Sequence, residues 1–97
     1  MDHYFAIRVE LHGELHDGEK YKRLHHALES LGFSRFVTST DGVRYQLPPA
    51  EYVYTIPGAT EQTVADAAKR TADSINPSTV MVHTAIRWTG RGLKPAA

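Results

Sequence analysis

The chain has 97 residues, enough for one domain with a single two-layer core and too few for two. Eleven basic residues balance eleven acidic ones, which excludes the strong overall field of a nonspecific nucleic-acid binder, so any polyanion site must be local. The chain has no cysteine, no apolar run of the ~20 residues that span a membrane, and no basic and apolar signal segment at its start. We therefore expect a cytoplasmic protein without membrane contact, cofactor or disulfide.

The first predicted strand covers residues 4–12 and alternates apolar with polar side chains, so that one face packs on the core. Its expected core residues are Phe5, Ile7, Val9 and Leu11. A glycine loop with Asp17 as the helix N-cap leads into a helix from about 18 to 31. The apolar stripe of this helix is Tyr21, Leu24, Leu28 and Leu31. Gly32 suits the left-handed residue after the helix, and Phe33 supplies the apolar contact that accompanies it.

The middle of the chain contains three strand-like pieces. Asp41-Gly42 is a two-residue hairpin signal that joins 34–39 to 43–47. Pro48-Pro49 would delete ladder hydrogen bonds in a central strand, so the prolines belong to a connection and the central third strand is expected at 51–56. Residues 34–47 then form the sheet edge, either as a hairpin or as a bent strand.

A second helix and a last strand complete the pattern. Thr60 is the expected N-cap of this helix. Its predicted buried stripe is Val64, Ala67, Ala68, Thr71 and Ile75. The last strand is expected at 79–88. One side of this strand carries Val80, Val82 and Ile86, and the other carries Met81, His83, Ala85 and Arg87.

This order of elements predicts an α+β fold, the ferredoxin-like βαββαβ two-layer sandwich. We expect one domain over 1–97, with an antiparallel sheet in the order 4-1-3-2 and a flexible basic tail at 89–97. Both right-handed crossovers place their helices on the same sheet face, which leaves the other face bare.

The bare face carries the residues most suited to chemistry: Arg8, Glu10, His12, His83 and Arg87. Metal-independent RNA cleavage needs a base for the 2′-hydroxyl, an acid for the leaving oxygen and a cation for the phosphorane charge. The candidate catalytic residues are His12, Arg8 and Glu10. The candidate nucleic-acid-binding residues are Arg8, His83, Arg87 and Arg91. The alternative is a polar homodimer interface with Arg–Glu pairs and no catalysis. We predict no metal site, because in the segment from His12 to His16 the glutamate is one place late for an H-E-x-x-H motif.

Several short motifs resemble a known family. They are Arg8-Val9-Glu10-Leu11-His12, Tyr21-x-x-Leu24-His25, Gly32-Phe33-Ser34-Arg35, Asp41-Gly42 and Tyr45-x-Leu47-Pro48-Pro49-Ala50-Glu51-Tyr52. Over most of positions 4–56 the chain resembles a small bacterial family of mostly uncharacterised proteins related to the GhoS antitoxin, a sequence-specific endoribonuclease of a type V toxin-antitoxin pair.

The resemblance implies the split βαβ sandwich of Cas2-like proteins. It also implies an RNA-binding or endoribonuclease antitoxin, with single-stranded RNA, a small toxin or the toxin mRNA as partner. Arg8, Glu10, His12 and Glu51 match the motif of the uncharacterised branch, which assigns no catalytic role to them. The competing hypothesis is a noncatalytic homodimeric protein-interaction module.

Overall fold

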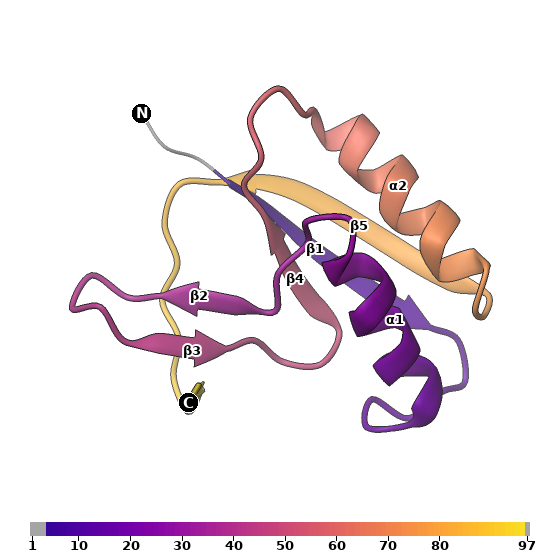
Figure 1. Ribbon diagram of the computed structural model, residues 1–97, viewed down its shortest axis with the longest axis horizontal. Coiled ribbons are helices and arrows are strands. Elements are labelled where there is room, and N and C mark those ends of the chain that lie inside the picture. The colour runs from indigo at the N-terminus through magenta and orange to yellow at the C-terminus, as the bar shows by residue number, and fades with distance from the viewer. Residues whose placement is uncertain (1–3, 97) are drawn as a thin grey trace.

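The computed structural model describes residues 4–96 as an α+β fold with two helices and two small antiparallel sheets (Figure 1). The elements in chain order are β1 (Tyr4–Leu11), α1 (Glu19–Glu29), β2 (Phe36–Thr38), β3 (Arg44–Gln46), β4 (Glu51–Tyr54), α2 (Glu61–Asp73), β5 (Ser78–Ala85) and β6 (Lys94–Pro95). Neither helix is long and apolar enough to cross a membrane.

The main sheet has the order β4-β1-β5, with β1 in the centre and antiparallel to both neighbours. This part of the predicted strand order is confirmed. The alternation along β1 also behaves as expected, because its four apolar side chains are all buried: Phe5, Ile7, Val9 and Leu11. The main sheet therefore has one core face, and the polar residues of β1 lie on the other.

Both helices pack on the core face (Figure 1). The buried helix side chains are Tyr21, Leu24 and Leu28 from α1, and Val64, Ala68 and Ala72 from α2. Val80 and Val82 of β5 are partly buried against this cluster. Leu31 was expected in the α1 stripe, but it is 48% exposed because the helix ends at Glu29 and the chain then turns away.

The helix ends follow the sequence signals with one exception. Gly32 has a φ of 97°, and the N–H of Phe33 donates to the carbonyl of Leu28 at 3.1 Å, which confirms the expected C-terminal motif. Thr60 and Thr63 exchange side-chain to backbone hydrogen bonds at the start of α2, as expected for an N-cap. The prediction of Asp17 as the N-cap of α1 was wrong, since Gly18 occupies that position and provides no side-chain hydrogen bond.

The prediction of a single ferredoxin-like sheet was also wrong. Residues 34–47 do form a hairpin around Asp41-Gly42, but β2 and β3 pair with β6 in a separate sheet of order β2-β3-β6. Only an isolated bridge between Ser34 and Val53 joins this hairpin to β4. The hairpin leaves the main sheet directly after this bridge, so it cannot continue the ladder as a fourth strand (Figure 1).

The last part of the chain also differs from expectation. β5 ends at Ala85 and not at 88, and Ile86 is 57% exposed instead of buried. The following segment returns beside the hairpin, where Lys94 pairs with Gln46 and the N–H of Ala96 donates to the carbonyl of Arg44 at 2.8 Å. The flexibility expected for 89–97 is not tested by this arrangement and stays a prediction. Ala97 lies outside the described residues.

Candidate nucleic-acid interface

Arg8, expected as a cation for the phosphate, is held between two carboxylates on the open sheet face. Its guanidinium forms an ion pair with Glu10, whose Oε2 lies 2.6 Å away, and donates a hydrogen bond to Glu51 Oε2 at 3.2 Å. One arginine between two glutamates leaves this group with a formal charge of −1. An RNA phosphate would be repelled by the group as a whole, so the surroundings of Arg8 do not favour an anion.

Glu10 is held as a carboxylate. Its Oε1 atom lies 3.0 Å from His16 Nε2 and accepts a 3.4 Å hydrogen bond from the Tyr21 hydroxyl. The hydrogen bond with His16, helped by the charge of Arg8, lowers the pKa of Glu10 despite some opposing desolvation. At neutral pH Glu10 therefore has no proton to give to a leaving oxygen.

The two histidines of the predicted site lie at opposite ends of the sheet. His83 is paired with Ala6, whereas His12 follows the pair formed by Leu11 and Ser78. His12 lies six positions along the chain from Ala6, which corresponds to about 20 Å of strand. Nε2 of His12 instead lies 2.7 Å from Thr79 Oγ1. The structure does not bring the two histidines to one phosphate, and the catalytic role of His12 stays a prediction.

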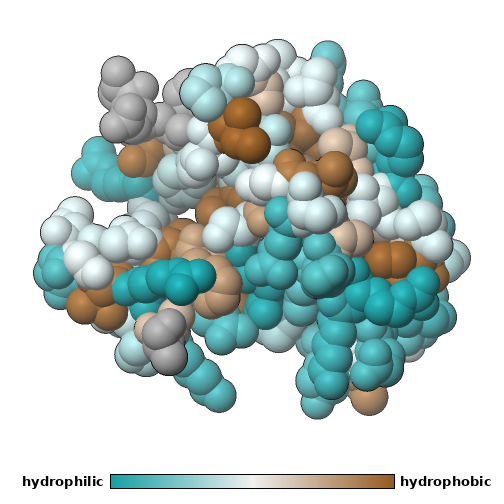
Figure 2. Space-filling view, in the orientation of Figure 1, coloured by the Kyte–Doolittle hydropathy of each residue, from teal (hydrophilic) through white to brown (hydrophobic). Residues whose placement is uncertain are grey.

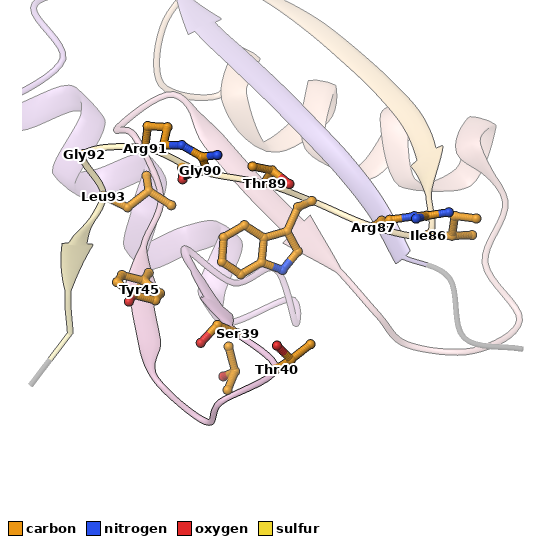
Figure 3. A pocket seen from close by; sticks show the side chains of 12 residues that line it. Ser39, Thr40, Tyr45, Ile86, Arg87, Thr89, Gly90, Arg91, Gly92 and Leu93 are labelled. Carbon is orange, nitrogen blue, oxygen red and sulfur yellow. Dashed lines mark hydrogen bonds between the residues drawn. The ribbon is translucent and has the colours of Figure 1, made fainter.

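Arg87 and Arg91 occupy a different place, a pocket of about 630 Å³ between the hairpin and the segment that follows β5. Figure 3 shows Ser39 and Thr40 near the hairpin tip and Tyr45 on β3, with Arg91 on the facing segment. Arg87 lies at the far end of the pocket, next to the end of β5 (Figure 3). The volume falls within the ~300–1,000 Å³ range of small-ligand sites.

Two aromatic rings line the same pocket. Tyr45 and Trp88 meet edge to face, with ring centroids 6.3 Å apart and an interplanar angle of 71°. The lining also contains the hydroxyl residues Thr38, Ser39, Thr40 and Thr89, and none of its residues carries a carboxylate. Sequence reasoning missed Trp88, because nothing in the residue pattern places it opposite the hairpin. It is the single tryptophan of the chain, and in the sequence it lies between Arg87 and Arg91.

Charge is segregated between the two parts of the fold. The hairpin and the C-terminal segment, residues 34–47 and 86–96, contain five basic residues and one acidic residue, a formal charge of +4. The rest of the chain has six basic and ten acidic residues, a formal charge of −4. The chain therefore has a basic second sheet although its net charge is zero. The sequence contains this charge asymmetry, but it can be recognised only when the two segments are known to lie together.

The basic residues around the second sheet are Arg35, Arg44, Arg87, Arg91 and Lys94. Arg44 lies over the ring of Phe36, with its guanidinium carbon 3.8 Å from the ring centroid, which is a cation–π contact. Arg91 donates to the carbonyl of Gly90 at 2.8 Å. Figure 2, which has the orientation of Figure 1, shows that hydrophilic side chains also gather over α1. The charged side chains of the hairpin and the C-terminal segment, however, are predominantly positive.

Within residues 4–96, no group of three or more His, Asp or Glu side chains is arranged to hold a metal ion. Comparisons of the chain with protein-family models and with curated proteins found no match. The resemblance to relatives of GhoS therefore rests on the short motifs alone and remains a prediction.

Proposed function

We propose that this protein binds single-stranded RNA in the pocket between the hairpin and residues 86–93. The observation that carries the proposal is the pairing of Trp88 and Tyr45 with Arg87 and Arg91 in one carboxylate-free pocket. Proteins that bind single strands combine aromatic rings, on which bases stack, with cations that follow the phosphate backbone. The pocket offers both within a basic half of the molecule.

In the proposed binding mode, the two sides of the pocket contact different groups of the RNA. A base stacks on the indole of Trp88, while the guanidinium groups of Arg87 and Arg91, on either side of it in sequence, contact the flanking phosphates. The hydroxyl group of Thr40 is a donor and acceptor that suits the 2′-hydroxyl and base edges of RNA, whereas the Ser39 hydroxyl already donates to Asp41 and offers the RNA an acceptor. A duplex would keep its bases stacked on one another, so a single strand fits this arrangement better.

Such binding should be weak and salt-dependent, because few phosphates are neutralised. For two phosphate contacts on a single strand, the logarithm of the binding constant should fall with the logarithm of salt concentration with a slope of about −1.4. Removing one arginine should reduce this slope by about 0.7.

The test is a titration of the protein with a short RNA oligonucleotide, followed by tryptophan fluorescence. Since Trp88 is the only tryptophan, stacking of a base should quench the emission directly. Trp88→Ala should weaken binding measured by anisotropy of labelled RNA about 5- to 150-fold, the effect of one lost stacking contact of ~1–3 kcal/mol. Arg87→Ala and Arg91→Ala should each flatten the salt dependence.

The control is Arg23→Ala, which removes an exposed arginine of α1 outside the basic half. Arg8→Ala serves as a second control, because Arg8 is already paired with two glutamates. RNA binding that is unchanged in Trp88→Ala and in the Arg87/Arg91 double variant would reject the proposal and favour the noncatalytic interaction module. Cleavage of the RNA that survives EDTA and is lost in His12→Ala would add the endoribonuclease activity expected from the sequence. A role as an antitoxin stays a prediction.

A further inference from the structure

A second pocket, of about 300 Å³, lies at the base of the hairpin, where β3 leads into the two prolines. Its polar lining residues are Arg35, Gln46 and Lys94. Gln46 and Lys94 are paired across β3 and β6, so their side chains leave the small sheet on the same side. Tyr45, which lines the aromatic pocket described above, is the neighbour of Gln46 on β3 and therefore points to the other side. The two pockets thus use opposite sides of β3.

Arg35 is fixed in this second pocket by the neighbouring strand. Its Nη2 atom donates to the carbonyl of Leu47 at 3.0 Å, and its own carbonyl accepts from the N–H of Leu47 at 2.7 Å. The Nε atom is buried and has no hydrogen-bond partner, and among the described residues Nη1 forms no hydrogen bond either. A half-buried guanidinium stays charged, so its incomplete hydrogen bonding costs free energy that an anion at Nη1 can offset.

Neither cation of the second pocket has a carboxylate partner. The ion pairs in the part of the chain that the structure describes use other cationic residues, which are Arg8, His16, Lys20, Lys22 and Lys69. None of the residues that line the pocket is acidic. The charge of Arg35 also reaches the core, because after burial it is the second cause that lowers the pKa of His25 to about 4. The pocket therefore holds two positive charges and no negative one.

We propose that this second pocket binds a phosphate monoester, with Arg35 and Lys94 in contact with the phosphate group. Such a group carries a charge of about −1.5 to −2 at pH 7, which matches two cations better than the single charge of a phosphodiester or a carboxylate. Nη1 of Arg35 offers N–H donors, Lys94 supplies a point charge from the facing strand, and the carboxamide of Gln46 adds a neutral donor.

The rest of the pocket suits the carbon skeleton that carries the phosphate. Leu47, Pro49 and Leu93 line it with apolar atoms. The volume is at the lower end of the ~300–1,000 Å³ range of small-ligand sites, so the phosphate and the group next to it are recognised and a whole nucleotide is not. The proposal does not rest on RNA binding in the aromatic pocket, since neither Arg35 nor Lys94 lines that pocket.

The experiment is a titration of the full chain with glycerol phosphate, a monoester without a base, followed by amide chemical shifts in NMR spectra. We expect shifts at Gln46, Leu47 and Leu93, and weaker binding of dimethyl phosphate, which has a single charge. Glycerol, the uncharged counterpart, should cause no shift. Shifts confined to residues 86–91, or no shift in the second pocket at tens of millimolar, would overturn the proposal.

Variants separate this site from general attraction to the basic sheet. Arg35→Ala should weaken the binding of glycerol phosphate at least tenfold, because a charged hydrogen bond is lost. Lys94→Ala, at an exposed side chain, should also weaken it and does not depend on the fold tolerating the loss of Arg35. Arg44→Ala is the matched control, since it removes the same charge from the small sheet outside the pocket. Equal weakening in Arg44→Ala, or unchanged binding in Lys94→Ala and Arg35→Ala, would overturn the proposal.

A last comparison identifies the source of the phosphate. RNA with a phosphate at its 5′ end should bind more tightly than RNA with a hydroxyl there if the strand end occupies this pocket. Arg35→Ala should then abolish the preference, whereas Trp88→Ala should weaken both RNAs and keep it. Glycerol phosphate bound in the second pocket without any such preference would support a small phosphate ester as the ligand. The two arms thus distinguish failure of the phosphate site from failure of the RNA site.

Discussion

The hydroxyl of Tyr52 lies 2.5 Å from Nδ1 of His25, so that a side chain of β4 is hydrogen-bonded to one of α1. Burial, together with the nearby charge of Arg35, lowers the pKa of His25 to about 4. Burial raises the pKa of Tyr52, which therefore keeps its proton and can donate it to the tautomer of the neutral ring in which Nδ1 carries no hydrogen. The ring centroids of the two residues are 5.6 Å apart. The contact joins the helix layer to the sheet, and burial keeps His25 uncharged at neutral pH.

We expect the protein to lose stability as the pH falls from about 6.5 to about 4. In the unfolded chain His25 has its ordinary pKa of about 6.5, whereas in the folded chain its pKa is about 4. The stability contributed by the neutral ring is thus complete above pH 6.5 and is lost through this window. Urea unfolding at several pH values measures the effect.

His25→Gln should flatten this pH dependence, because glutamine keeps a hydrogen-bonding group for Tyr52 and does not titrate. His26→Gln is the matched control on the exposed side of α1. A wild-type slope between pH 6.5 and 4 that is identical in His25→Gln would show that another group is responsible.

Leu28→Ala should destabilise the fold by ~2–5 kcal/mol, because the side chain is fully buried and its removal leaves a cavity in the core. Leu31→Ala is the control three residues later, where the side chain is 48% exposed, and it should change the free energy of unfolding by less than ~0.5 kcal/mol. Denaturant unfolding of both variants measures the difference. Equal losses would contradict the position of α1 on the sheet.

Tyr21→Phe should cost ~1–3 kcal/mol although it removes only one oxygen. The buried hydroxyl accepts a 2.7 Å hydrogen bond from the N–H of Leu11, and phenylalanine would leave this N–H without its partner. Tyr45→Phe, at the half-exposed pocket ring, is the comparison and should be close to neutral. Thermal unfolding with matched denaturant curves checks both, and a neutral Tyr21→Phe would mean that water replaces the hydroxyl.

Thr60→Ala should destabilise α2 by ~0.5–2 kcal/mol, since the hydroxyl of Thr60 accepts from the N–H of Thr63 at the start of the helix. Thr60→Ser keeps the oxygen and should retain most of the stability. If alanine and serine behave alike, the hydrogen bond contributes nothing measurable.

The main sheet and its helices could be predicted because their signals are long and local. The alternation of β1 extends over eight residues, and the α1 stripe includes two leucines that are fully buried. Asp41-Gly42 also predicted a turn, although the sequence left open whether residues 34–47 form a hairpin or a bent strand, and Gly42 has a φ of 87° that few other residues adopt. Each of these features is decided by neighbours in the sequence.

The second sheet and the pocket could not be predicted in the same way. β2 and β3 have three residues each and β6 has two, too few for an alternating pattern to be recognised. The pairing of Lys94 with Gln46 joins segments that no local rule connects, and it places Trp88 opposite Tyr45. The surroundings of Arg8 could not be predicted for a related reason: the sequence showed which face Arg8 occupies, but not that it lies between the carboxylates of Glu10 and Glu51.

The pairing of β1 with β5 has a consequence for how the chain folds. Partners across this ladder are 67 to 81 residues apart in sequence, from Leu11 with Ser78 to Tyr4 with Ala85. The central strand therefore gains its second neighbour only after most of the intervening chain has been brought into place, and long loop closure slows such folding. The β2–β3 hairpin needs only a short turn and can form within microseconds. The smaller, basic sheet should thus begin to form well before the core that carries it is complete.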